Sequence, residues 1–272
     1  MKKIIALLMV LCMAFTFAAC TKTQTETNTN TEVASDFDYI TEKGKMTIGI
    51  TLFAPMNYND ENGELIGFET EFTKAVCENL GVDAEFQEIN WDSKEVELNS
   101  KNIDCIWNGM TITDERKATM SISAPYMENK QVMVVKAENA AKYAQSVESA
   151  SVVAEAGSAG EELATGDEFF ANADFTAVDS MAKALMDVAS GTSDIAIVDY
   201  VTSIGSIGEG TDFADLVVVD SKEFGQEEYG IAFRTGSDVT EKVNAAMKEL
   251  AANGTLDEIA KKYKLDELII VE

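Results

Sequence analysis

Arg116 is the residue whose type and position in this sequence point most directly to chemistry. A short apolar run, residues 103–107, has the length of a buried strand, and it ends at Asn108-Gly109, where glycine lets a backbone approach a ligand closely. Thr113 has the pattern of a helix N-cap, with acidic residues in the first turn before Arg116. A guanidinium is the group best shaped to hold a carboxylate bidentately. The stretch predicts a carboxylate-binding loop, and an ordinary strand-to-helix turn with a surface arginine is the alternative.

Short motifs in a fixed order along the chain carry a resemblance to a known family. They are Ala54-Pro55, Gly63-Glu64-Leu65-Ile66-Gly67-Phe68-Glu69, Gly109-Met110-Thr111-Ile112-Thr113-Asp114-Glu115-Arg116, Ser123-Ala124-Pro125-Tyr126, Gly157-Ser158-Ala159-Gly160-Glu161, Asp199 and Tyr229-Gly230-Ile231-Ala232-Phe233. Each motif alone is weak, but their order and spacing together are specific, and they fall within residues 46–264. The chain resembles the extracytoplasmic amino-acid-binding proteins of ABC importers, the polar amino acid family 3.

The resemblance implies a site for the two charged groups of a free amino acid. Arg116 would hold the α-carboxylate, and Thr111 would add a hydroxyl and an N–H. Gly157-Ser158-Ala159 opens a helix and would offer further N–H groups, although family members often carry Thr where Ala159 stands. Asp199, at a strand tip after four apolar residues, would pair with the α-ammonium, and the carbonyl of Gly109 would accept a second ammonium proton. Without the resemblance, an N-cap for the segment that follows is the alternative for Asp199.

Two aromatic residues match family positions whose rings sandwich the side chain of the ligand. These are Phe53 and Trp91, and tryptophan is strong in stacking and in cation–π contacts. Plain core packing is the alternative for Phe53. Trp91 stands between polar Asn90 and Asp92, so we expect it to lie outside a core.

Departures from one branch of the family leave the identity of the amino acid open. The loop before Arg116 is similar to that of the glutamine-binding branch, which reads the amide with Asp, Lys and His at three further places. Those places hold approximately Ile50, Glu155 and Val198 here, so glutamine is not supported. Glu155 either faces a cationic side chain or is simply solvated.

The elements that must position these residues follow an α/β pattern. Strands expected at 46–50, 84–89 and 103–107 alternate with helices at 69–80 and 92–100, which is typical of a mostly parallel sheet. A second alternation of strands and helices ends in a strand at 195–198. Asp199, at the tip of that strand, corresponds to Asn108 in the first alternation. Ligands in such sheets bind outside the carboxyl ends of the strands, so Asn108 is also a candidate site residue.

The resemblance implies a two-lobed, periplasmic-binding-protein-like fold of type II. Lobe 1 would comprise residues 36–129 plus 222–272 and lobe 2 residues 130–221, each a mostly parallel sheet flanked by helices. The chain would cross between the lobes near 128–131 and 220–224.

The N-terminus has the pattern of an exported lipoprotein. Residues 1–19 combine two lysines with an apolar run, which is typical of a signal peptide and short for a membrane span. Phe17-Ala18-Ala19-Cys20 resembles a bacterial lipobox, in which the cysteine is lipidated, and a plain secretory signal is the alternative. Residues 20–35 are polar and read as a flexible tether. We expect the protein at the extracytoplasmic face of the cell membrane, anchored through Cys20.

Composition narrows the classes of function. The formal net charge of −27 argues against nucleic-acid binding and favours a monomer. The chain has no histidine, which removes Ser-His-Asp and Cys-His mechanisms, and we expect neither a metal site nor a cofactor. Cys77 and Cys105 are either buried small apolar residues or a disulfide.

These observations predict a solute-binding lipoprotein that captures a free amino acid and delivers it to the permease subunits of an ABC importer. It would perform no chemistry. Two alternatives remain: an enzyme on the same fold, similar to a cyclohexadienyl dehydratase, and a module that senses the ligand without an importer.

Overall fold

The computed structural model describes residues 35–219, 222 and 224–271. The expected signal peptide, Cys20 and almost all of the expected tether lie outside these residues. Within the described residues, no helix is long and apolar enough to cross a membrane.

One group of strands is built around three parallel neighbours. β4 (Asp83–Glu88), β1 (Lys45–Ile50) and β5 (Cys105–Thr111) pair in that order, and β12 (Gln226–Arg234) joins β5 in the antiparallel sense. The short strand β6 (Met120–Ile122) pairs with β12. A separate hairpin consists of β2 (Tyr58–Asn59) and β3 (Leu65–Ile66).

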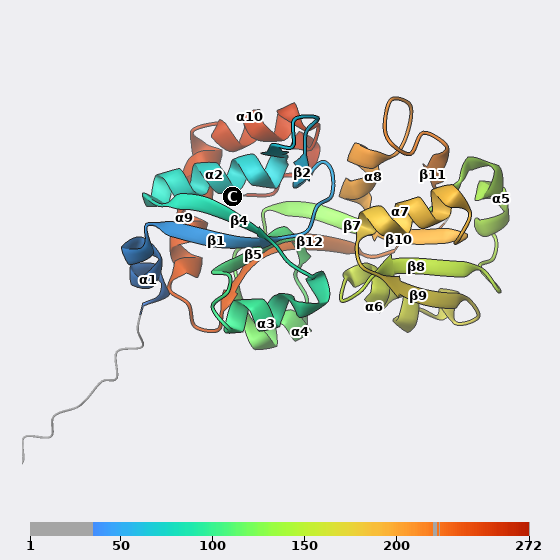
Figure 1. The fold of residues 1–272 in the computed structure, drawn as a ribbon, viewed down its shortest axis with the longest axis horizontal. Coiled ribbons are helices and arrows are strands. Elements are labelled where there is room, and N and C mark those ends of the chain that lie inside the picture. Colours follow the sequence, from blue (N-terminus) through green and yellow to red (C-terminus); the bar gives the residue numbers. More distant parts are fainter. Residues whose placement is uncertain (1–34, 220–221, 223, 272) are drawn as a thin grey trace, which may run out of the picture. The chain divides into compact units, whose positions relative to one another are not determined.

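Helices cover both faces of this group (Figure 1). α2 (Phe68–Leu80), α9 (Val239–Ala252) and α10 (Thr255–Lys262) pack against one another on one face, and α3 (Lys94–Asn99) lies on the other with α4 (Asp114–Thr119). α1 (Asp36–Lys43) precedes β1, and 3₁₀ turns occur at Trp91–Ser93 and Asp266–Leu268. α2 ends at Gly81, whose left-handed backbone, φ 75°, is the expected helix stop.

The second group repeats the plan with other residues. β10 (Ile195–Asp199), β8 (Ser151–Glu155) and β9 (Asp174–Val178) are parallel, and β10 also pairs with β7 (Met127–Lys136) in the antiparallel sense. β11 (Leu216–Val218) pairs with the other edge of β7. α6 (Ala159–Gly166) and α7 (Met181–Ser190) lie on opposite faces (Figure 1), and α5 (Ala140–Tyr143), α8 (Tyr200–Ser206) and 3₁₀ turns at Ala137–Asn139 and Glu168–Phe170 complete the segment.

β7 belongs to both groups. Residues 127–130 pair with β12, whereas residues 131–136 pair with β10 and β11. The hydrogen-bonded path is therefore continuous, in the order β4-β1-β5-β12-β7-β10-β8-β9. The pairing is more mixed than the expected mostly parallel sheets, because β7 and β12 both run against their neighbours.

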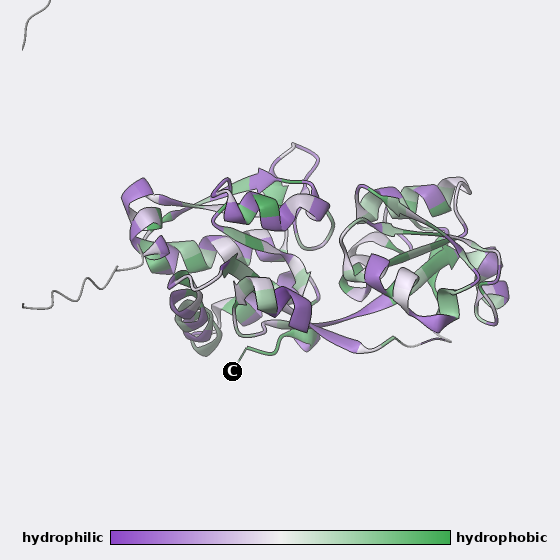
Figure 2. Ribbon diagram, turned by 90° about the horizontal axis from the view of Figure 1, so that it is seen from below, coloured by the Kyte–Doolittle hydropathy of each residue, from purple (hydrophilic) through white to green (hydrophobic). Residues whose placement is uncertain are grey.

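Hydrophobic residues concentrate along the strands (Figure 2), where they form the buried clusters that hold helices to sheet. Phe72, Trp107 and Tyr126 pack as an aromatic group in the first cluster, with the rings of Phe72 and Trp107 edge to face and their centroids 5.2 Å apart. Cys77 and Cys105 are free and buried in the same cluster, which supports their interpretation as small apolar residues and not as a disulfide.

The break expected at Asn108-Gly109 is wrong. β5 continues through both residues to Thr111, because β12 pairs with its end: Tyr229 faces Thr111 and Gly230 faces Met110. The register shifts between Gly230 and Ala232, and Gly109 adopts φ 55° within the strand. The glycine therefore provides an irregularity inside a strand and not the end of one.

Candidate functional site

Arg116 is a buried cation and not a surface arginine. Thr113 caps α4 by accepting from the N–H of Arg116 at 3.2 Å, as expected from the sequence. The Arg116 side chain is 5% exposed, and its Nη1 donates to the carbonyl of Thr111 at 2.8 Å. Nη2 donates to Oε1 of Glu162 at 3.0 Å and to the carbonyl of Gly157 at 3.4 Å. A carboxylate thus already occupies one edge of the guanidinium, and it comes from a side chain that is 53% exposed.

The Gly157-Ser158-Ala159 loop lies against this cation. Ser158 is the N-cap of α6 and accepts from the N–H of Glu161 at 3.2 Å. Gly157 has φ 71°, and a Cβ there would stand 3.0 Å from the backbone of Asp92, so the close approach requires glycine. The start of α6 is therefore held beside Arg116, where helix N–H groups favour an anion.

Asp199 ends β10 as expected and is 2% exposed. Its Oδ1 accepts from Nδ2 of Asn129 at 2.9 Å and from Nε2 of Gln131 at 2.5 Å. Asp199 also stands at the N-cap position of α8, as the alternative interpretation expected, but its side chain makes no capping bond to that helix. Burial raises the pKa of Asp199 to about 7, and the nearby carboxylate of Glu227 adds to the rise.

Sequence reasoning missed Glu227, a half-buried residue of β12. Its Oε2 accepts from Oγ1 of Thr111, Nδ2 of Asn129 and Nε2 of Gln131, each at 3.1 Å. The two amides that bind Asp199 therefore also bind Glu227, and the carboxylates face the same space. The only signal in the sequence was a polar stretch, residues 226–228, which looks like an exposed strand end.

Trp91 and Lys94 form the part of the site that faces Gly157. Trp91 is 4% exposed and packs with apolar residues that include Leu98 and Met110, so the expectation that it lies outside a core is wrong. Nζ of Lys94 lies 4.9 Å from the centre of the Trp91 ring and donates to the carbonyls of Trp91, at 3.3 Å, and Gly157, at 2.9 Å. Burial, with Arg116 close by, lowers the pKa of Lys94 to about 8.

Phe53 and Gly109 are in contact. A Cβ on Gly109 would stand 3.0 Å from Cζ of Phe53, and Phe53 itself is 5% exposed. The N–H of Gly109 donates to Oε1 of Glu69 at 2.7 Å, and the hydroxyl of Tyr126 donates to the same oxygen. Burial raises the pKa of Glu69 to about 7. Glu69 therefore fixes the backbone of Gly109.

Asn108 is engaged within the fold. Its side chain accepts from the N–H and hydroxyl of Thr51, at 2.8 and 2.7 Å, and donates to the carbonyl of Thr51 at 2.9 Å. These bonds join β5 to the end of β1. Asn108 therefore lies inside β5 and not at its tip as expected, and its side chain is occupied within the fold.

Glu155 is not solvated. It ends β8, is 2% exposed, and its Oε1 has no hydrogen-bond partner among the described residues. Burial raises the pKa of Glu155 to about 8; the charge of Asp199 adds to the rise and that of Lys94 opposes it.

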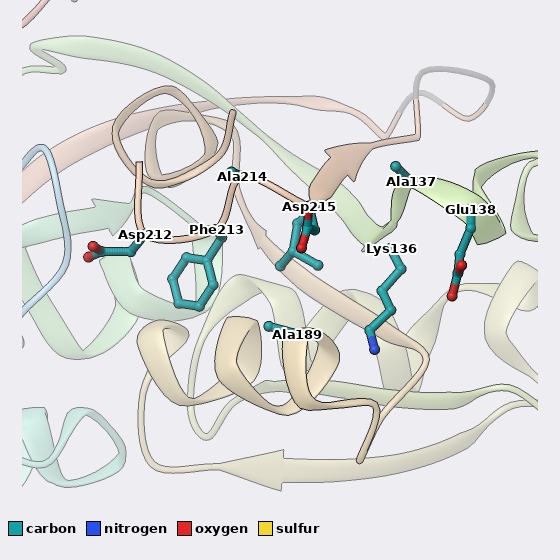
Figure 3. Close-up of a pocket in the computed structure, with 9 residues that line it drawn as sticks. Lys136, Ala137, Glu138, Ala189, Asp212, Phe213, Ala214 and Asp215 are labelled. Atoms are coloured by element: carbon teal, nitrogen blue, oxygen red, sulfur yellow. The ribbon is translucent and has the colours of Figure 1, made fainter. Parts of the chain in front are cut away.

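Neither a metal cluster nor the cavity described next adds a residue to this site within the described part of the chain. The described residues contain no acidic or cysteine cluster that could hold a metal ion. A cavity of about 460 Å³ is lined by the end of β7, α7 and residues 212–216 (Figure 3), and none of the expected site residues lines it.

Comparisons with known proteins show which family and fold this chain is similar to. Residues 46–266 match the profile of the bacterial extracellular solute-binding proteins, family 3. The L-cystine-binding protein TcyJ of Escherichia coli is 29% identical over 228 residues, 82% of this chain and 84% of TcyJ. The arginine-binding extracellular protein ArtP of Bacillus subtilis is 30% identical over 226 residues, 81% of this chain and 86% of ArtP. A histidine-bound ABC uptake transporter substrate-binding protein of Streptococcus pneumoniae superposes with a TM-score of 0.76 at 28% identity, covering 85% of this chain and 96% of that structure.

Proposed function

Because this chain belongs to the bacterial extracellular solute-binding proteins, family 3, we propose that it captures one free amino acid between the groups described above and delivers it to an ABC importer. Membership confirms the resemblance noted in the sequence, the periplasmic-binding-protein-like α/β fold, and the prediction of a binding protein without enzymatic activity. The residues that hold the ligand and the means of membrane attachment are our inference.

The α-carboxylate binds at Arg116. The observation that carries this assignment is that the buried guanidinium already holds a carboxylate, that of Glu162, at 3.0 Å. Because the Glu162 side chain is half exposed, it can withdraw to water when the ligand arrives. The N-terminus of α6, with Ser158 and Ala159, supplies N–H groups on the same side. Ala159 offers no hydroxyl, so backbone groups carry this part of the contact.

The α-ammonium binds at Asp199. Asn129 and Gln131 orient its carboxylate, and a cation placed there would relieve the unfavourable proximity of Glu227. The carbonyl of Gly109 accepts a second ammonium proton, since Glu69 takes the N–H of that residue and fixes its backbone.

Phe53 and Trp91 flank the ligand side chain with apolar surface. Phe53 lies against Gly109, and Lys94 binds the carbonyls of both Trp91 and Gly157, which supports this assignment.

The two groups of strands act as two lobes that close on the ligand. We assign lobe 1 to residues 36–129 plus 222–272 and lobe 2 to residues 130–221. β7 supports this division, since its first four residues pair with β12 and the rest with β10 and β11. Arg116 and Asp199 then come from different lobes, and hinge motion brings their contacts together.

Export and anchoring complete the proposal. Residues 1–19 are removed as a signal peptide, Cys20 becomes the lipidated N-terminus, and residues 20–35 tether a monomeric domain to the outer face of the cell membrane. The lipobox-like Phe17-Ala18-Ala19-Cys20 and the polar composition of the tether support this assignment.

A thermal-shift screen of the purified protein against the twenty common amino acids and cystine tests the function. A ligand present at 100 times its dissociation constant stabilises the folded state by about 2.7 kcal/mol, which moves the melting temperature by several degrees. We expect stabilisation by a small set of free amino acids. No shift with any amino acid would contradict the proposal.

A further inference from the structure

Glu155 presents an unpaired oxygen inside the protein. Its side chain is almost completely buried, and Oε1 has no hydrogen-bond partner among the described residues. Buried polar atoms are nearly always paired, because leaving one unpaired costs its hydration without compensation. Protonation does not remove the problem, since a neutral carboxyl group still has an oxygen that only accepts. A partner from outside the chain would satisfy this atom.

The position of Glu155 places that partner in the ligand site. The carbonyl of Glu155 accepts from the N–H of Ser158 at 3.2 Å, so the residue is built into the loop that precedes α6. Two residues along, the carbonyl of Gly157 accepts from both Arg116 and Lys94. β10, which ends at Asp199, is the parallel neighbour of β8.

The charges around this point are unbalanced. Asp199 interacts unfavourably with both Glu155 and Glu227. Lys94 is the cation that favours ionised Glu155, but its ammonium donates to two backbone carbonyls, and the ion pairs in the described part of the chain do not include it. The α-ammonium of an amino acid brings one positive charge, which Asp199 takes. The ionised form of Glu155 then still lacks a paired cation.

We propose that Glu155 binds the side chain of the ligand and that this side chain is positively charged, a guanidinium or an ammonium group. The inference rests on the function proposed above, since it assumes that Arg116 and Asp199 hold the α-carboxylate and α-ammonium. A neutral donor such as an amide would pair with the oxygen but would leave the repulsion between Glu155 and Asp199. A cation would both pair with the oxygen and reduce this repulsion.

L-arginine and L-citrulline separate these cases, because they have nearly the same shape and only arginine carries the charge. Calorimetric titration would compare the wild type with Glu155→Gln, which keeps the size of the side chain and removes its charge. Glu148→Gln is the matched control, since Glu148 is exposed and the change in net charge is the same. We expect the wild type to bind arginine about 30-fold or more tightly than citrulline, as for other buried charge pairs. Glu155→Gln should bring this ratio close to one, and Glu148→Gln should leave it unchanged.

Glu155→Asp is the control for a general effect of the substitution on folding. It keeps the charge on a shorter side chain, so it should retain a preference for arginine, smaller than that of the wild type. Equal affinity of the wild type for arginine and citrulline would overturn the inference, as would an unchanged ratio in Glu155→Gln.

The amino-acid screen distinguishes failure of this inference from failure of the function. If only neutral or acidic amino acids bind, the proposed function stands and the assignment of Glu155 is wrong. If no amino acid binds, the proposed function itself is wrong.

Discussion

Replacing Arg116 by alanine removes the cation on which the proposed site depends. In the structure the Arg116 side chain is only 5% exposed, and its Nη2 donates to the carboxylate of Glu162 at 3.0 Å. Removing one partner of a buried, hydrogen-bonded charge pair costs roughly 2–5 kcal/mol in binding. At about 1.4 kcal/mol for each factor of ten, the affinity for the amino acid should fall by about 30-fold or more.

Titration calorimetry with two ligands separates loss of the carboxylate contact from a general defect. One ligand is the amino acid selected by the screen, and the other is the amine that remains when its carboxylate is removed. The wild type should bind the amine poorly, because the contact with Arg116 is already missing. Arg116→Ala should therefore weaken the amino acid strongly and the amine only slightly. Lys117→Ala is the control, since Lys117 is exposed next to Arg116 and loses the same charge.

A further large loss for the amine on Arg116→Ala would refute this reasoning. Arg116 also donates to the carbonyl of Thr111 at 2.8 Å, so such a result would mean that it acts by holding β5 and α4 together. A melting temperature close to that of the wild type would establish that the variant is folded before either ligand is added.

Three further predictions concern the ammonium site, the anchor and the response to pH. Asp199→Asn should weaken binding of the amino acid while leaving the preference for a free carboxylate intact, and calorimetry with the same pair of ligands would reveal an altered preference. Cys20→Ser should release the protein into the medium; a variant that stays on the membrane, beside a wild type without a lipid-sized mass increase, would contradict the anchor. Burial raises the pKa of Glu69 from 4.5 in the unfolded chain to about 7, so the folded state binds more protons between these values. From pH 4.5 to 7 the free energy of unfolding attributable to Glu69 should therefore fall by about 3 kcal/mol, and urea denaturation of Glu69→Gln should lack that part of the decline.

Much of the fold could be predicted because its elements are encoded locally. α2 and α7 have apolar residues at helical spacing and end at the left-handed residues Gly81 and Gly191. β9 was missed, since its residues are largely exposed and lack an apolar run. The continuation of β5 past Gly109 could not be read either, because it depends on pairing with β12, more than 100 residues later in the sequence.

Prediction of the candidate site is limited in the same way, by contacts between residues far apart in the sequence. Arg116 and Asp199 stand out because a cap or an apolar strand precedes each of them. Glu227 and Lys94 do not, since their importance comes from partners on distant elements, such as Asn129 for Glu227 and Gly157 for Lys94. Burial of a carboxylate without a partner, as at Glu155, has no local signal at all.

The most direct test of the account is a crystal structure of the protein with the amino acid selected by the screen. We predict that the α-carboxylate lies on Arg116 in place of Glu162, close to the start of α6, and that the α-ammonium lies against Asp199. An amino acid bound in the reverse orientation, or bound elsewhere with Glu162 still on Arg116, would contradict the account.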